Sequence, residues 1–551
     1  MKQKINSILG GICSTCCLLY ACHGMQKAPR TTIATPETTS TYLEQHRPQF
    51  HFSPPAMWMN DPNGLVFFEG EYHLFYQYYP ERNVWGPMHW GHAVSRDLVH
   101  WEQLPIALYP DSLGYIFSGS AAVDWSNTSG FGENGKPPLV AMFTLHNMTR
   151  EKAGRKDVES QGIAYSNDRG RTWTKYSANP VLPNTENQRD FRDPKIVWHE
   201  ASKKWIVVLA VGDHAEFWSA PDLIHWTHLS DFGKEYGAHG GVWECPDFFP
   251  IRVEGTSETK WVLLQNLNPG GPNGGSCLQY FVGQFDGKTF SLDPDFAKSV
   301  SNGNGIWVDW GKDNYAGVTW SDLPKSDGRR LLLGWMSNWE YAQEVPTVAW
   351  RNAATLPREL VLTNTSEGYR FKCRPVKELK SLRKKSFELP KGEITEKIDL
   401  SDKLKFSPAQ SEWVLEFKLP EDLTPAVSSV DRFRGSVGIE LSNAKGETYR
   451  IGYDGNKNQF FSDRTKSGDH SFSKTFAAGI HTAPRISKAG VLRIHLYFDV
   501  ASAELFADDG STVMTELYFP TEIFNQAKIF VEGEKLTLSS GSIYALSRIW
   551  K

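Results

Sequence analysis

A short pattern recurs along the first half of this chain, and it constrains the fold more than any other feature. The pattern starts at serine or glycine, passes through a turn-forming aspartate and ends on an aromatic residue six or seven positions later: Ser95–Trp101, Ser166–Trp173, Ser219–Trp226 and Gly283–Phe290. The closing aromatics are 72, 53 and 64 residues apart, which fits one four-stranded blade with its loops. Because a single blade cannot bury its own face, the repeat predicts a β-propeller.

Short apolar, β-branched and aromatic runs fill the chain from residue 51 to about residue 362, separated by Gly, Pro, Asn and Asp. Tyr72–Tyr79 and Trp205–Val211 are examples, and long helical periodicity is absent. The four repeats and the strand-rich stretch Tyr315–Ser337 predict five blades. The alternative is one large β-sandwich in which the tryptophans recur by chance.

The composition changes after Leu362, and 551 residues exceed what one core usually supports. A basic stretch around Arg383–Lys385 resembles a connector, and alternating segments such as Trp413–Leu419 follow it, which predicts a β-sandwich. We therefore expect an all-β chain with a five-bladed propeller at residues 44–363, a linker at 364–386 and a sandwich at 387–551.

The N-terminus has the features of an export signal. Lys2 and Lys4 precede a short apolar run of small residues that ends at Cys22. Leu19–Cys22 resembles a bacterial lipobox, which implies a signal peptide at residues 1–21, lipid on Cys22 and a tether at 22–43. The alternative is an uncleaved anchor, although the run is shorter than the roughly 20 residues that a span needs. The membrane face to which the lipid holds the chain stays open between periplasm and cell surface, and the periplasm is preferred because no acidic cluster follows Cys22.

Composition excludes several other classes of protein. The 59 basic and 63 acidic residues give a net charge of −4, so the chain lacks the basic footprint of a nucleic-acid binder. Four of the seven cysteines lie within the first 22 residues, which excludes a disulfide framework. We expect no metal and no cofactor, since His89 and His92 have no other ligand at a recognisable spacing. The oligomeric state has no signature in the sequence.

Three acids stand beside aromatic residues in three successive blade-like units. Asp61 lies in Trp58–Gly64, Asp193 follows Arg192 and precedes a proline, and Glu244 is flanked by Trp243 and Cys245. Taken alone, each of these segments is explained by a structural role, as a turn or a local ion pair. Arg192 favours the ionised form of Asp193, whereas apolar neighbours favour the protonated form of Glu244. Glycoside hydrolysis needs an ionised and a protonated carboxyl on one bond, and aromatic faces suit sugars.

The chain resembles the fructan-cleaving glycoside hydrolases of family 32, among them the bacterial levanases. The motifs that carry the resemblance are Trp58–Gly64, Phe75–Tyr78, Trp85–His92, Phe117–Ser120, Phe191–Pro194, Trp243–Pro246, Tyr280–Gly283, Asp309–Gly311, Gly334–Trp339, Leu356–Leu360, Ile451–Asp454, Asp463–Arg464 and Glu504–Phe506. One departure is 498–503, which lacks the Arg-Ser-Ser usual in the family. This departure concerns the sandwich, not the acids.

The resemblance implies roles for particular residues. Asp61 would be the nucleophile, Glu244 the acid and base, and Asp193 the stabiliser of the transition state, in a retaining double displacement. Such a site holds its two carboxyls about 5–5.5 Å apart, against about 6.5–9.5 Å in an inverting one. The pocket for a terminal fructose would be lined by Asn60, Gln77, Trp85, Phe117, Ser118 and Arg192, and by one or both of Trp335 and Trp339.

We therefore expect an exported exo-β-fructosidase that acts on levan, inulin or sucrose. Three alternatives remain open from the sequence: an endo-levanase, a fructosyltransferase and a non-catalytic fructan-binding lipoprotein. The last would be expected to lack at least one acid, and all three are present. Preference between β-2,6 and β-2,1 linkages depends on loop shapes that no residue string specifies.

Overall fold

The computed structural model describes residues 42–420 and 433–550, and almost every regular element in them is a strand. The expected signal peptide, the expected lipidation site Cys22 and all but the end of the expected tether lie outside the described residues. Among the residues that are described, no helix is long and apolar enough to cross a membrane.

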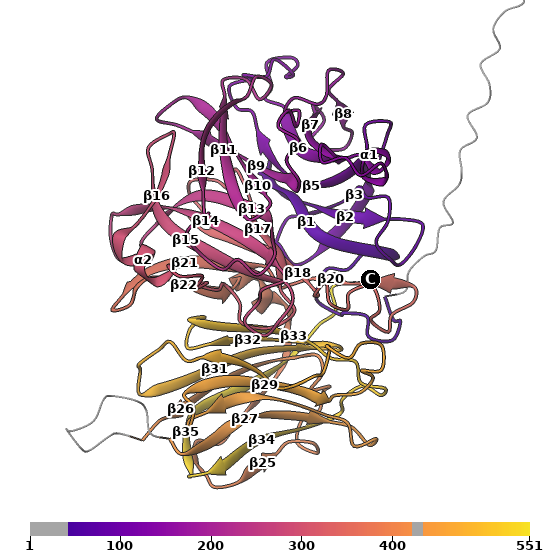
Figure 1. The fold of residues 1–551 in the computed structure, drawn as a ribbon. Coiled ribbons are helices and arrows are strands. Elements are labelled where there is room, and N and C mark those ends of the chain that lie inside the picture. The colour runs from indigo at the N-terminus through magenta and orange to yellow at the C-terminus, as the bar shows by residue number, and fades with distance from the viewer. Residues whose placement is uncertain (1–41, 421–432, 551) are drawn as a thin grey trace, which may run out of the picture. The chain divides into compact units, whose positions relative to one another are not determined.

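Five sheets in the described residues form the blades of a β-propeller (Figure 1). Their strands are β1 (Met57–Phe68), β2 (Glu71–Tyr79), β3 (His89–Ser95) and β4 (Trp101–Leu108); β5 (Tyr115–Val123), β6 (Leu139–His146), β7 (Glu159–Ser166) and β8 (Thr174–Lys175); β9 (Phe191–His199), β10 (Lys204–Val211), β11 (His214–Ala220) and β12 (Thr227–Phe232); β13 (Val242–Arg252), β14 (Thr259–Asn268), β15 (Cys277–Phe285) and β16 (Phe290–Leu292); and β17 (Tyr315–Thr319), β18 (Arg330–Met336), β21 (Arg358–Thr365) and β22 (Gly368–Pro375). The prediction of five blades is confirmed, and the single large sandwich is wrong.

The first strand of each blade forms an inner ring. β1 contacts β5, β5 contacts β9, β9 contacts β13, β13 contacts β17 and β17 returns to β1. Two short strands add to the sheets: β19 (Trp350–Arg351) pairs in parallel with β1, and β20 (Ala353–Ala354) pairs with β18. Because β19 lies between β18 and β21 of the fifth blade in the chain but joins the sheet of the first, it helps to close the ring.

The sequence repeat is the turn between the third and fourth strands of a blade. In the first blade the carboxylate of Asp97 accepts hydrogen bonds from the backbone N–H groups of Val99 and His100, at 3.0 and 2.8 Å. The equivalent carboxylates of the next three blades accept from backbone N–H groups in the same way: Asp168, Asp222 and Asp286. The recurring aspartate therefore caps a tight turn, and the aromatic after it lies at or next to the start of the outer strand.

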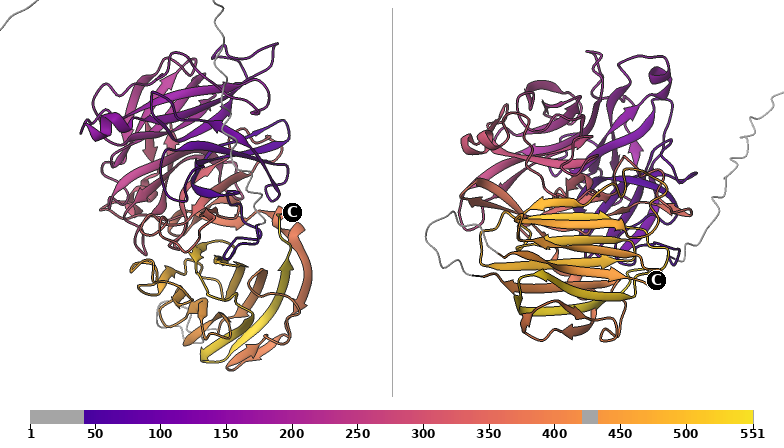
Figure 2. Two further views of the ribbon diagram at one scale, coloured as in Figure 1. Left: turned by 90° about the vertical axis from the view of Figure 1, so that its right-hand side faces the viewer. Right: turned by 60° about the horizontal axis from the view of Figure 1, so that its bottom comes forward.

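The second domain contains two sheets of the described residues, whose strands run alongside one another in the right-hand view of Figure 2. One contains β23 (Arg383–Glu388), β24 (Gly392–Ile394), β35 (Leu536–Leu546), β26 (Ser411–Lys418), β31 (Val491–Asp499), β32 (Ser502–Ala507) and β33 (Thr512–Leu517); the other contains β25 (Lys397–Asp399), β34 (Gln526–Gly533), β27 (Gly435–Ser442), β28 (Thr448–Asp454), β29 (Gln459–Lys466) and β30 (His481–Pro484). Alternate residues of the central strands, such as Trp413, Leu415 and Phe417 on β26, are buried in one core. The predicted sandwich is confirmed.

The segment expected to be a linker, 364–386, is instead mostly regular structure. β22 pairs with β21 and completes the fifth blade, a 3₁₀ helix (η1, Lys377–Leu382) follows, and β23 pairs with β35 in the sandwich. The basic residues that resembled a connector, Arg383–Lys385, lie at the start of β23 with half-buried or exposed side chains. Charge on the solvent side of an edge strand looks the same in sequence as charge in a linker.

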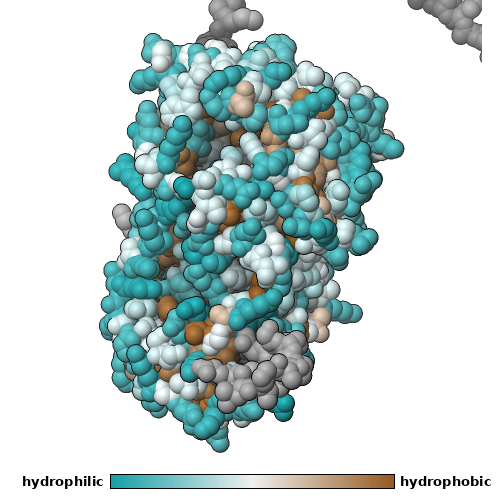
Figure 3. Space-filling view, turned by 90° about the vertical axis from the view of Figure 1, so that its left-hand side faces the viewer, coloured by the Kyte–Doolittle hydropathy of each residue, from teal (hydrophilic) through white to brown (hydrophobic). Residues whose placement is uncertain are grey.

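Hydrophobic residues on the face drawn in Figure 3 appear as small patches among hydrophilic ones. Few large apolar side chains of the described residues are strongly exposed; they include Tyr109, Trp125, Val348 and Ile523. Two short helices, α1 (Met148–Lys152) and α2 (Pro294–Ser299), complete the elements of the propeller region.

Buried ion pairs join propeller residues to sandwich residues. Arg464 on β29 donates to Asp313 at 2.6 Å and to the hydroxyl of Tyr341 at 2.9 Å, and all three side chains are buried. In the same way, Arg358 on β21 pairs with Glu504 on β32 at 2.6 Å. Removing one partner of such a pair leaves a desolvated charge without compensation. These contacts also hold segments next to the pocket described below.

We expect Arg464→Met to lower the free energy of unfolding by about 3–5 kcal/mol, because it leaves the buried carboxylate of Asp313 without its cationic partner. Urea unfolding followed by tryptophan fluorescence measures the change. The matched control is Arg450→Met, which removes partly exposed pairs with Glu532 and Glu440 and is expected to cost less than about 1 kcal/mol. Equal losses in the two variants would contradict a special role for the buried pair.

Candidate active site

The inner strands place one functional group each at the beginning of the strand. These groups are Asp61 on β1, Ser118 on β5, Asp193 on β9, Glu244 on β13 and Tyr315 on β17. The three acids were expected in three successive blades, and this expectation is wrong. They come from the first, third and fourth blades, and the second contributes Ser118 instead.

Each inner strand has an irregular register at this point. The pairing shifts between Met59 and Pro62 on β1, and comparable shifts occur beside the functional residues of β5, β9, β13 and β17. Asp193, Cys245 and Ala316 have positive φ angles of 63°, 44° and 51°. A β-bulge changes the direction in which a side chain points, and such backbone angles cost about 1–3 kcal/mol each in non-glycine residues. The strain is thus concentrated where the side chains converge.

A pocket of about 510 Å³ collects ten of the eleven residues predicted for the propeller site. Those lining it are Asn60, Asp61, Gln77, Trp85, Phe117, Ser118, Arg192, Asp193, Glu244 and Trp339. Trp335 is the exception: it is fully buried and packs against Trp58 and Trp339, with ring centroids 6.2 and 4.8 Å away. Trp335 supports the wall of the pocket and does not line it.

Asp61 is held by three donors. The Ser118 hydroxyl donates to Oδ2 at 2.6 Å and the Asn60 amide donates to Oδ1 at 3.1 Å. The Cys245 thiol lies 3.5 Å from Oδ2. Burial raises the pKa of Asp61 and the charge of Glu244 adds to the effect, while these hydrogen bonds oppose it. The carboxyl group is therefore oriented firmly and is harder to ionise than an exposed aspartate.

Asp193 lies on the other side of the same thiol. The backbone N–H of Cys245 donates to Oδ2 of Asp193 at 2.9 Å, and the thiol lies 3.6 Å from that oxygen. Burial, opposed by the charge of Arg192 and reinforced by the charges of Glu244 and Asp61, leaves the pKa of Asp193 raised to about 8. Burial and the neighbouring carboxylates also raise the pKa of Cys245, so its thiol stays protonated and able to donate.

Glu244 is oriented by a cation and a phenol. Arg192 Nη2 lies 2.9 Å from Oε1, and the Tyr315 hydroxyl donates to Oε2. Burial raises the pKa of Tyr315 well above its usual value, as does the charge of Glu244, so the phenol remains a donor. The side chain of Glu244 is 20% exposed and that of Asp193 is 5% exposed. Of these two acids, Glu244 has the better access to solvent.

Arg192 also pairs with two carboxylates that sequence reasoning missed. Its Nη1 atom lies 2.7 Å from Asp190 and 3.3 Å from Glu159, and Glu159 in turn contacts His146 at 3.1 Å. Burial raises the pKa of Glu159, but the charge of Arg192 and the contacts with His146 outweigh it and leave that pKa lowered. The guanidinium is thus shared among several carboxylates.

The missed residues differ in how visible they are in the sequence. Tyr315 opens the first strand of the fifth blade, so the rule that each inner strand begins at the site could have found it. Glu159 begins β7 and His146 ends β6, which are the two middle strands of the second blade. No local motif marks them, because they reach the site only through the pairing of strands.

The pocket mouth is lined by charged residues of the segment that contains and follows α1. Glu151, Arg155 and Lys156 line it there, together with Arg189 from the loop before β9. One group in the described residues has the composition of a metal site, namely His214, Glu216 and Asp231 on β11 and β12. None of these three lines the pocket.

Comparisons with known proteins agree with this geometry. The glycosyl hydrolases family 32 N-terminal domain matches residues 51–375, and the family 32 C-terminal domain matches 378–545. A levanase of Bacillus subtilis is 43% identical over 93% of this chain and 72% of its own length. The crystal structure of an exo-inulinase from Aspergillus awamori superposes with a TM-score of 0.81 at 35% identity, covering 92% of this chain and all of that one.

A further solved structure is a variant of a fructofuranosidase from Schwanniomyces occidentalis in complex with fructosylnystose. It superposes with a TM-score of 0.79 at 32% identity and covers 93% of this chain and 99% of that one. Family matches, relatives and structures thus span the propeller and the sandwich alike. Three acids in one pocket, on a fold shared along nearly the whole length, lead to one conclusion: the chain belongs to family 32 of the glycosyl hydrolases.

Proposed function

We propose that this enzyme releases terminal β-D-fructofuranosyl residues from fructans such as levan and inulin, and from sucrose, with retention of configuration. The observation that carries the proposal is the convergence of Asp61, Asp193 and Glu244 on one pocket around Arg192. The names of the similar proteins, a levanase and an exo-inulinase, support the substrate class. The endo-levanase remains the second candidate, because the same acids serve both.

Asp61 is the proposed nucleophile. Ser118 and Asn60 fix its two oxygens, which lowers the entropy that must be lost when the carboxylate attacks. Attack on the anomeric C2 forms the fructosyl–aspartate ester and breaks the bond from C2 to the leaving oxygen. The donors around Asp61 oppose the rise in its pKa that burial causes, so they favour the ionised form that the attack requires.

Glu244 is the proposed acid and base. Three carboxyls lie close together in this pocket, and the raised pKa values of Asp61 and Asp193 indicate that the three carboxyls together retain a proton near neutral pH, which the proposed mechanism places on Glu244. In the first step Glu244 gives its proton to the leaving oxygen. In the second it takes a proton from water, the hydroxide oxygen bonds to C2, and Asp61 leaves as a carboxylate. The greater exposure of Glu244 suits exchange with that water.

Asp193 and Arg192 complete the proposed machinery. The Asp193 carboxylate stabilises positive charge that develops on the sugar ring and accepts its hydroxyls. Arg192 keeps Glu244 oriented and compensates the charges of several carboxylates. Trp85 and Phe117 meet edge to face at 5.9 Å and provide an apolar wall, with Gln77 and Trp339 as further lining residues.

We also infer that the chain is exported and anchored through lipid on Cys22, on the periplasmic side of a membrane. The support is the charged and then apolar start of the sequence and its lipobox-like end. A similar protein described as an extracellular exo-inulinase, from Aspergillus awamori, supports export.

We expect Asp61→Ala and Glu244→Ala to lower kcat on sucrose by about 10²–10⁴-fold or more, because each removes a group that acts on the reacting bond. Only Glu244→Ala is expected to recover part of its activity on a β-fructoside with a good leaving group, which needs no proton. Steady-state kinetics measure both effects. The control is Glu151→Gln, a carboxyl at the mouth of the pocket, and near-wild-type activity of either acid variant would refute the assignment.

Exo action predicts that fructose is the sole early product from levan and inulin, since only chain ends enter the pocket. Chromatography of a time course measures product size. Oligosaccharides that accumulate before fructose would identify the endo-levanase. Products longer than the substrate would identify a fructosyltransferase.

Asp193→Asn is expected to inactivate the enzyme and yet stabilise it at alkaline pH. The folded pKa of about 8 lies above the roughly 3.9 of an unfolded aspartate, so this carboxyl destabilises the fold increasingly as pH rises from about 4 to about 8. The stability of the variant relative to wild type should therefore increase by about 1 kcal/mol or more between pH 5 and pH 8.5. Thermal unfolding at several pH values measures it, with the exposed Asp402→Asn as control; a difference independent of pH would refute the raised pKa.

A further inference from the structure

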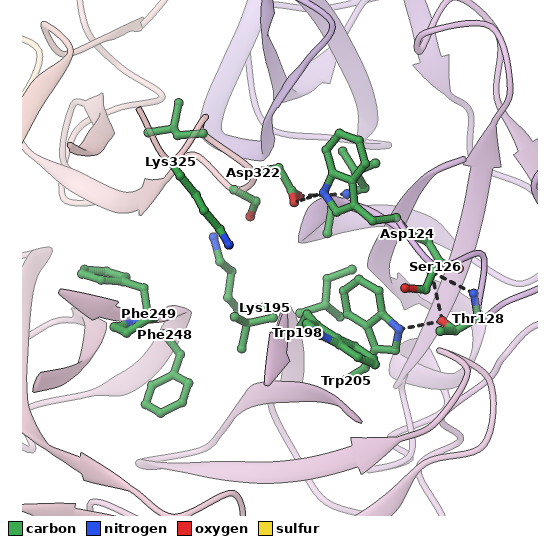
Figure 4. Close-up of a pocket in the computed structure, with 18 of the residues that line it drawn as sticks. Asp124, Ser126, Thr128, Lys195, Trp198, Trp205, Phe248, Phe249, Asp322 and Lys325 are labelled. Carbon is green, nitrogen blue, oxygen red and sulfur yellow. Dashed lines mark hydrogen bonds between the residues drawn. The ribbon is translucent and has the colours of Figure 1, made fainter. Parts of the chain in front are cut away.

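A second cavity lies at the other ends of the same inner strands. It measures about 450 Å³ and is lined by later residues of β5, β9 and β13 and by the segment 321–325 after β17. The active-site pocket is lined by the first residues of β5, β9 and β13. Figure 4 shows this cavity, with Lys325 and Asp322 on one side and Trp198 and Trp205 on another. The catalytic proposal uses none of its lining residues.

Buried polar side chains separate the two cavities. Lys195 Nζ donates to the carbonyl of Thr319 at 2.9 Å and pairs with Asp247 at 3.1 Å. A small space of about 10 Å³ lies between the cavities, lined by residues such as Asp193 and Lys195. No sugar fits through it. The second cavity is therefore neither an extension of the active-site pocket nor an exit for its product.

One wall of the second cavity is an exposed but fixed indole. Trp125 is 62% exposed, and its Nε1 atom donates to Oδ1 of Asp322 at 2.8 Å. The other oxygen of Asp322 accepts from the backbone N–H of Val123 at 2.9 Å. A carboxylate tied to the backbone thus holds the ring in place while its surface stays open to solvent. Such a pre-organised aromatic surface gains contact energy at little entropic cost.

Further aromatic and polar groups line the cavity beside it. Trp198 packs edge to face on Trp205 at 5.4 Å, and Trp205 donates to the Thr128 hydroxyl at 2.8 Å. Ser126 and Lys325 also line the cavity, and neither side chain forms a hydrogen bond or an ion pair with another residue in 42–420 or 433–550. Rigid aromatic surfaces beside unused hydroxyl and ammonium groups suit a neutral polyhydroxylated ligand.

We propose that this cavity is a second carbohydrate-binding site, which holds an internal stretch of the β-fructan polymer on which the active site works. The C–H face of a sugar packs on Trp125, and its hydroxyls bind Ser126, Lys325 and Asp322. The choice of fructan as the ligand rests on the proposed function, because the substrate polymer is the carbohydrate that this enzyme meets at every turnover.

The benefit of such a site is avidity. A polymer held at the second cavity keeps its chain ends at a high local concentration near the pocket, provided that the chain is long enough to reach both. Sucrose is too short to bridge the two ends of the propeller. Occupation of the second site therefore lowers the KM for long fructans and leaves the kinetics on sucrose unchanged.

The first test compares Trp125→Ala with wild type on sucrose and on high-molecular-weight levan and inulin. We expect the KM for at least one polymer to rise roughly 2- to 10-fold, which corresponds to the loss of one aromatic contact. The KM and kcat for sucrose should stay unchanged. The matched control is Ile523→Ala, which removes an apolar side chain of similar exposure in the sandwich. An unchanged KM for both polymers overturns the proposal.

Should Trp125→Ala also impair sucrose hydrolysis, the double variant Ser126→Ala/Lys325→Ala decides, because it leaves the aromatic packing intact. A raised polymer KM with normal sucrose kinetics supports the site, and unchanged kinetics on both overturn it.

Binding without turnover gives an independent readout. In gels containing levan or inulin, the Glu244→Gln protein is expected to be retarded, and adding Trp125→Ala is expected to reduce the retardation at least twofold. Equal retardation of the two proteins overturns the second site. If wild type fails to cleave any fructan or sucrose, the proposed function fails instead, which separates the two outcomes.

Discussion

In the active-site pocket, four carboxyl groups share the charge of Arg192: those of Glu159, Asp190, Asp193 and Glu244. Asp193 is almost fully buried and Glu244 pairs directly with the guanidinium. Such a cluster is unfavourable for the fold, since burial and mutual repulsion disfavour full ionisation. The same physics gives the site its chemistry, because a group that retains a proton beside an ionised carboxylate is what glycoside cleavage needs.

The inner ring provides the rigidity that holds these charges together. Each of its five strands begins at the site and has an irregular register there, so the side chains converge although they come from blades far apart in sequence. The stability of the surrounding sheets offsets the unfavourable backbone angles at Asp193, Cys245 and Ala316. The sandwich adds to this support. Its Arg464 holds Asp313 and Tyr341, which are close in sequence to Tyr315 and Trp339.

Much of this architecture is predictable from the sequence, because it rests on local patterns. The aspartate of each repeat caps a turn through its own neighbours in the chain, so the repeat marks the blades directly. The three acids and most lining residues lie in short motifs typical of the family. Because short motifs mark both the blades and the site residues, the sequence predicts the fold class and the composition of the site at once.

The wrong predictions concern features that depend on contacts between segments far apart in the chain. The second blade supplies Ser118 and not an acid, Trp335 lies behind the wall it was expected to form, and β22 and β23 resemble a charged linker. Tyr315 and Glu159 reach Glu244 and Arg192 only because strands far apart in the chain lie side by side. No single segment of the sequence contains that information.

The most direct test of the mechanism is to identify the residue that bonds to sugar. Glu244→Gln, incubated briefly with an activated β-fructoside and then digested, should yield one peptide heavier by a single fructosyl group, with Asp61 as the modified residue by tandem mass spectrometry. The absence of any adduct under conditions where the leaving group is released, or an adduct on a different residue, would contradict a covalent mechanism through Asp61.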